Sequence, residues 1–78
     1  MKNEIYLIGG VGEEITLQSV IDQVEQSNEN EPLNVHIHSG GGSVYDGLAI
    51  YNYLKNLKQE VNTHSSGLVA SIATIIFL

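Results

Sequence analysis

The sequence contains no cysteine, no tryptophan and no arginine, and it has a single proline among its 78 residues. Without cysteine there are no disulfides and no thiolate metal ligands, although small secreted domains usually depend on such crosslinks. This absence favours a reducing, cytoplasmic setting, or a segment that further sequence supports. A chain of this length forms one domain at most and has a marginal core.

Basic residues are also scarce, because three lysines stand against nine acidic residues and the net charge is −6. Binding to a phosphate backbone needs clustered lysine and arginine, so nucleic acid is not an expected partner. Anionic membrane surfaces are disfavoured for the same reason. No apolar run is long enough to span a bilayer, and the first residues lack the apolar core of a signal peptide.

Apolar periodicity predicts strands that alternate with helices along the whole chain. The predicted strands are residues 4–8, 33–38 and 60–64, and the predicted helices are residues 16–27, 43–57 and 68–78. This order predicts an α/β layout with a mainly parallel sheet and right-handed crossover helices.

Local signals refine these elements. Thr16 is the expected N-cap of the first helix, and residues 65–67, Ser-Ser-Gly, indicate a turn after the third strand. The last residues contain no glycine, proline or basic residue of the kind that ends a helix. We therefore expect truncation inside an element; an apolar C-terminus packed on a partner is the alternative. The apolar stripe expected to be buried on the second helix is Val44, Leu48, Tyr51, Leu54 and Leu57.

Three adjacent glycines, Gly40 to Gly42, lie between the second strand and the second helix. Glycine allows positive φ and a close approach of the backbone to a ligand. Backbone N–H groups beside a helix N-terminus can bind an anion or an oxyanion. The phosphate-loop pattern G-x-x-x-x-G-K-[ST] is absent. A flexible turn is the alternative interpretation.

Ser71 follows the third predicted strand and opens the last apolar segment. A serine at such a turn can expose its hydroxyl while the next N–H points to the same place, as in a nucleophile elbow, although G-x-S-x-G is absent. A serine nucleophile needs a base, and an ordinary helix-start serine is the alternative. One backbone donor from each of the two segments could hold a tetrahedral oxyanion beside this hydroxyl.

Together the two segments resemble the Clp protease proteolytic subunit family. Residues 37–51, I-H-S-G-G-G-S-V-Y-D-G-L-A-I-Y, are similar to its I-N-S-x-G-G-x-V-x-x-G-x-A-I-Y segment. Residues 67–73, G-L-V-A-S-I-A, are similar to its G-x-A-A-S-x-A nucleophile segment, at the same separation. The triple glycine and Asp46-Gly47 are most similar to the phage and prophage branch, which is linked to capsid maturation.

The resemblance implies a ClpP/crotonase-like α/β fold, with residues 1–78 as the N-terminal portion of a single peptidase domain. It also implies peptide-bond hydrolysis through an acyl-enzyme on Ser71, without a cofactor. The family's base and its acidic partner lie beyond Leu78, so this chain alone should be inactive. The other implied site residues are two oxyanion donors, Gly42 and Ile72, and three residues that pair with an extended substrate, Gly41, Ser43 and Val44.

The segments depart from the family pattern at three positions, where His38 replaces asparagine, Gly40 replaces proline and Val69 replaces alanine. The position of His38 does not match the family's base, and nothing in the spacing supports His64 as a substitute base. His36 and His38 share a strand face, but no third metal ligand is evident, so exposed histidines without a metal are expected.

Partners are implied by the resemblance as well. Clp-type subunits form stacked rings, which implies a homo-oligomer, and an AAA+ unfoldase or phage capsid proteins are further candidates. Two other functions stay open. One is a crotonase-like acyl-CoA enzyme, which would use similar glycine loops to hold a thioester oxyanion. The other is a non-catalytic capsid assembly module with a vestigial site.

Overall fold

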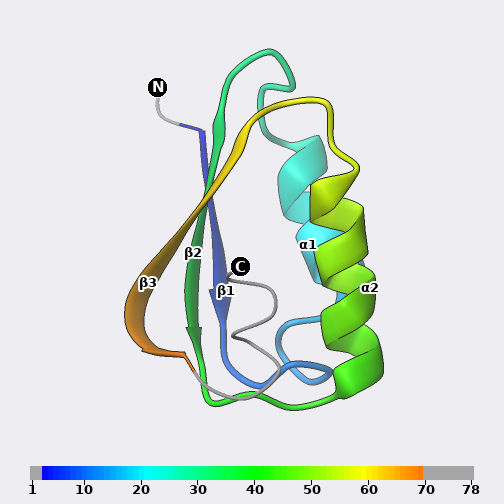
Figure 1. Cartoon of the computed structure of the whole chain (residues 1–78), viewed down its shortest axis with the longest axis vertical. Coiled ribbons are helices and arrows are strands. Elements are labelled where there is room, and N and C mark those ends of the chain that lie inside the picture. Colours follow the sequence, from blue (N-terminus) through cyan, green and yellow to red (C-terminus); the bar gives the residue numbers. More distant parts are fainter. Residues whose placement is uncertain (1–2, 70–78) are drawn as a thin grey trace.

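The computed structural model describes residues 3–69, with side chains to residue 64. The strands form one sheet in the order β1-β2-β3, and both neighbouring pairs are parallel. The predicted α/β layout with a parallel sheet is therefore confirmed. The elements in chain order are β1 (Glu4–Ile8), α1 (Leu17–Glu25), β2 (Leu33–Ser39), α2 (Val44–Lys55) and β3 (Val61–Val69) (Figure 1).

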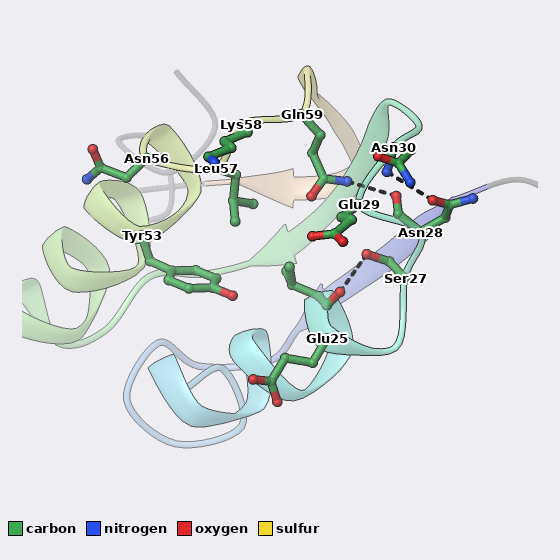
Figure 2. A pocket seen from close by; sticks show the side chains of 11 residues that line it. Glu25, Ser27, Asn28, Glu29, Asn30, Tyr53, Asn56, Leu57, Lys58 and Gln59 are labelled. Carbon is green, nitrogen blue, oxygen red and sulfur yellow. Dashed lines mark hydrogen bonds between the residues drawn. The ribbon is translucent and has the colours of Figure 1, made fainter.

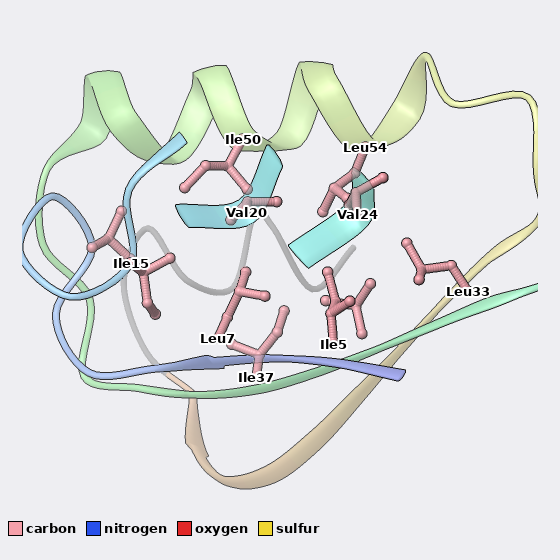
Figure 3. Packing of buried hydrophobic residues seen from close by; sticks show 11 residues of the cluster. Ile5, Leu7, Ile15, Val20, Val24, Leu33, Ile37, Ile50 and Leu54 are labelled. Carbon is pink, nitrogen blue, oxygen red and sulfur yellow. The ribbon is translucent and has the colours of Figure 1, made fainter. Parts of the chain in front are cut away.

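Both helices cover the same face of the sheet, as right-handed crossovers between parallel strands require (Figure 1). Side chains alternate along each strand, so every second residue points toward the helices. Figure 3 shows these apolar side chains meeting those of α1 and α2. The buried core consists of Ile5, Leu7, Val11, Ile15, Val20, Val24, Leu33, Val35, Ile37, Ile50 and Leu54.

The caps explain where both helices begin. Thr16 accepts a hydrogen bond from the backbone N–H of Ser19, and the Ser19 hydroxyl accepts one from the N–H of Thr16, each at 3.0 Å. This capping box confirms the predicted N-cap. Ser43 caps α2 by accepting from the N–H of Asp46 at 3.3 Å. The helices end earlier than predicted, at the C-caps Gln26 and Asn56.

The third strand is longer than the sequence predicts. β3 continues through the expected turn at residues 65–67 and ends at Val69, so the turn prediction is wrong, as is the predicted helix at residues 68 and 69. Ile37 pairs with Ser65 and Ser39 pairs with Val69, so four residues of β3 span two of β2. This irregularity keeps the strand paired with β2, and pairing outweighs the local turn preference of Ser-Ser-Gly. The remaining residues of the predicted helix, 70–78, lie outside the described part.

The face that α2 buries matches the prediction only in part, at Leu54, which is buried, and at Leu57, which packs against the core. Gly47, Ile50 and Leu54 are buried, whereas Val44 is 57% and Leu48 is 42% exposed. The helix carries apolar side chains on more than one side, so periodicity alone cannot select its inner face. The side of α2 that is buried is set by where the helix lies on the sheet.

We expect Ile37→Val to lower the free energy of unfolding by about 0.5–1.5 kcal/mol, because it removes a buried methylene from the centre of the core. Ile37 is fully buried on the central strand. Ile8→Val is the matched control, since Ile8 is 59% exposed on β1. Urea unfolding measures both variants, and equal losses would contradict the assigned core.

Candidate functional site

Two loops meet at the carboxyl end of the sheet, one after β1 and one after β2 (Figure 1). The first loop crosses from Gly9 to Thr16, and the second holds the three glycines. An isolated parallel bridge joins Val11 of the first loop to Gly42 of the second. In open α/β sheets this end is where ligands bind, so these loops define the candidate site.

Val11 holds the glycine loop through two backbone hydrogen bonds. Its N–H donates to the carbonyl of Gly41 at 2.8 Å, and its carbonyl accepts from the N–H of Ser43 at 2.8 Å. The peptide bonds of this loop are trans, and the C=O and N–H of a trans peptide point in opposite directions. The N–H and the C=O of Gly42 therefore point away from Val11.

Only glycine fits at position 42. Its φ is +145°, and a Cβ built there would overlap the carbonyl oxygen of Val11. Gly12 is restricted in the same way, with φ +97° and an ideal Cβ 2.9 Å from the Cβ of Ser43. The two loops are therefore packed backbone against backbone, and side chains on these glycines would separate them.

Ser39 shapes the loop from inside. It is 2% exposed, and its hydroxyl accepts a hydrogen bond from the N–H of Gly41 at 3.1 Å. The buried Ser39 hydroxyl thus gives the Gly41 N–H a hydrogen-bond partner, which this backbone group would otherwise lack within the turn. The N–H of Gly41 is thus bonded within the loop, while Gly42 is exposed.

The structure brings together four of the predicted site residues. Gly41 is buried, Ser43 is half-buried at the helix N-terminus, and Gly42 and Val44 are exposed. Ser71 and Ile72 lie outside the described residues. Sequence reasoning missed the role of Val11, although Gly9, Gly10 and Gly12 around it signalled a loop with unusual backbone geometry.

Comparisons with known proteins show which family is similar to this chain. The sequence profile of the family described as Clp protease matches residues 1–78. The chain belongs to the Clp protease family. It is 33% identical over 79 residues to an ATP-dependent Clp protease proteolytic subunit from Bdellovibrio bacteriovorus, covering 97% of this chain and 37% of that protein.

Solved structures of the Clp protease family share the fold. ClpP1 from Listeria monocytogenes superposes with a TM-score of 0.82 at 29% identity, covering 94% of this chain and 44% of that one. The ClpP catalytic domain from Plasmodium falciparum gives 0.81 at 32% identity, covering 95% and 42%. The chain therefore has a ClpP-like fold, and it spans less than half the length of these relatives.

The histidines lie on the sheet face opposite the helices, away from the core. The rings of Tyr6, His36 and His64 stack across three strands, with centroids 4.9 and 5.1 Å apart. His36 is half-buried and pairs with the carboxylate of Glu4, so the prediction that it is simply exposed is wrong. His38 is exposed, as predicted. Within the described part, no group of three His, Cys, Asp or Glu residues could hold a metal ion.

A hollow of about 1010 Å³ lies between the C-terminal ends of α1 and α2 (Figure 2). It opens at the other end of the helices from the glycine loop, so it is separate from the candidate site. Burial, with a smaller contribution from the Glu25 carboxylate, raises the pKa of the Tyr53 hydroxyl above its ordinary value.

None of the helices in residues 3–69 is long and apolar enough to cross a membrane.

We expect Gly42→Ala to destabilise the protein by at least about 1–3 kcal/mol, because alanine there needs positive φ and overlaps Val11. Gly40→Ala is the control, since Gly40 is exposed and is not among the glycines with positive φ. Chemical unfolding measures the difference. A Gly42 variant as stable as the Gly40 variant would show that the loops are not in contact.

Tyr53 should contribute to a loss of stability at alkaline pH. Its raised pKa means that the unfolded state ionises first as pH rises above about 10, so the free energy of unfolding falls from there until the folded state ionises too. Tyr53→Phe should lose less stability than wild type in urea unfolding between about pH 9 and 11. Tyr45→Phe, at an 89% exposed position, is the control and should behave as wild type.

Proposed function

We propose that the intact protein is a Clp-type serine endopeptidase in which Ser71 is the nucleophile and residues 1–78 form the N-terminal portion of one peptidase domain. Gly42 and Ile72 would donate the two oxyanion N–H groups. The base and its acidic partner would come from sequence beyond Leu78. Residues 1–78 by themselves would then be inactive, with at most residual catalysis from the oxyanion donors.

The pairing of Ser39 with Val69 carries this proposal. It holds the end of β3 beside the end of β2, where the glycine loop begins. Neighbouring strands are about 4.8 Å apart, and Ser71 is two residues beyond Val69, a reach of about 7.6 Å between Cα atoms. A nucleophile at position 71 beside the loop that presents Gly42 is compatible with this reach, which is what the proposal requires.

The orientation of Gly42 supports its role. Its N–H points away from Val11 and the residue is exposed, so it can donate to an oxyanion without breaking a bond seen in the loop. Gly41 and Ser43 already use a carbonyl and an N–H for Val11. An extended substrate would therefore pair on the opposite edge, through Gly42, with Val44 next to it at the start of α2.

The relatives also inform the assembly. The name of one relative, "ATP-dependent Clp protease proteolytic subunit", supports an ATP-dependent partner and a role as the proteolytic part of an assembly. A homo-oligomeric ring, a cytoplasmic setting and an AAA+ unfoldase are what the family resemblance implies for the intact protein. The triple glycine and Asp46-Gly47 support kinship with the phage and prophage branch, and thus phage capsid proteins as partners. The Clp protease match over residues 1–78 favours the peptidase over a crotonase-like acyl-CoA enzyme or a vestigial capsid module.

A fluorophosphonate probe tests the nucleophile. In the longer protein that contains the family's base, we expect stoichiometric labelling at Ser71 by peptide mass spectrometry, and its loss in Ser71→Ala. Ser66→Ala is the control and should label as wild type. The 78-residue chain should label orders of magnitude more slowly, because it lacks the base. Rapid labelling of this chain, or labelling of the longer Ser71→Ala variant, would overturn the assignment.

A further inference from the structure

Among the described residues, the outer edge of β1 is paired with a side chain and not with a strand. β1 stands at one edge of the described sheet. The carbonyl of Asn3 and the N–H of Gly9 bond to β2, and backbone groups alternate between the two edges of a strand. The N–H and C=O of Tyr6 therefore point outward, away from β2.

Gln23 of α1 occupies both of these groups. Its side-chain oxygen accepts from the N–H of Tyr6 at 2.8 Å, and its side-chain nitrogen donates to the carbonyl of Tyr6 at 2.9 Å. A primary amide offers the same donor and acceptor as a backbone peptide. The Gln23 side chain thus stands where one residue of a neighbouring strand would stand.

We propose that Gln23 guards the β1 edge against pairing with β1 of a second copy of this chain. Two copies related by a two-fold axis at Tyr6 can pair antiparallel, with Tyr6 opposite Tyr6. This pairing uses the same N–H and C=O that Gln23 now holds. Withdrawal of the Gln23 side chain is therefore the step that exposes the interface.

The residues of β1 favour a second copy as the occupant. In the Tyr6-centred register, Glu4 faces Ile8 and Ile5 faces Leu7, so no like charges are opposed and the pairs are otherwise apolar. Tyr6 is 54% and Ile8 is 59% exposed. The strand has strong β preference, a single charge and no proline, which are features of segments that associate through an edge. A two-fold interface uses the same surface on both copies, so it needs no further partner.

Gln23→Met tests the proposal, because methionine keeps the length and helix preference of glutamine but forms neither bond. Amide exchange by NMR and sedimentation velocity are measured across a range of protein concentration. In wild type, protection of the Tyr6 amide should not depend on concentration. In Gln23→Met, its exchange should accelerate about tenfold in dilute solution, and protection should return as concentration and sedimentation coefficient rise.

Gln18→Met is the matched control. Gln18 is exposed on the same helix and bonds only to the Asp22 side chain in the described structure. If Gln18→Met associates to the same extent, the effect is general hydrophobicity and the proposal is wrong. It is also wrong if Tyr6 in Gln23→Met exchanges as in wild type.

The Val35 amide on β2 reports whether each variant is folded. If Gln23→Met proves unfolded, Gln23→Asn gives the second measurement, because asparagine stays polar but is one methylene too short to reach both groups. Concentration-dependent protection of the Tyr6 amide in folded Gln23→Asn would support the proposal that Gln23 blocks pairing at the β1 edge. Wild-type exchange and sedimentation in that variant would overturn it.

Discussion

The parallel pairing of β2 with both of its neighbours is the constraint on which the rest of the structure depends. It places Val35 and Ile37 at 0% exposure beneath the two helices, and it fixes where the glycine loop emerges. It also sets Tyr6, His36 and His64 in one row on the opposite face. A shift of β2 by one residue would turn its buried side chains outward and break all three arrangements.

The candidate site is built from backbone rather than from side chains. Val11 holds the loop on one edge, and the geometry of trans peptides then directs the Gly42 N–H to the other. Ser39 satisfies the Gly41 donor from below. Such preorganisation suits oxyanion stabilisation, because fixed donors need no rearrangement as charge develops. The cost is that glycine is required wherever the two loops touch.

The backbone N–H and C=O groups at the β1 edge of the sheet are treated differently from those at its carboxyl end: the first are hydrogen-bonded to a side chain and the second are exposed. At the carboxyl end, backbone groups are left open where a ligand could use them. At the β1 edge, the amide of Gln23 occupies the groups that another strand would take. The same chemistry, a peptide N–H and C=O that are not paired with a neighbouring strand, is thus open to a ligand at one place and blocked at the other.

Much of the fold was predictable because it depends on local patterns. A short apolar run before Gly9-Gly10 predicted β1, alternation predicted most of β2, and Thr16 marked the start of α1. The triple glycine and its register with Ser71 were enough to predict the Clp protease family. The extent of β3 was not predictable, because pairing with Ile37 and Ser39 overrides the turn preference of Ser-Ser-Gly.

The sequence by itself determined the order of the elements, the acidic charge and the motif residues, since these depend on neighbours along the chain. Only the tertiary structure decided which side of α2 is buried, that Val11 directs Gly42, and that Gln23 closes the β1 edge. The physical reason is that each of these depends on contacts between residues far apart in sequence. No local pattern encodes the distances that such contacts require.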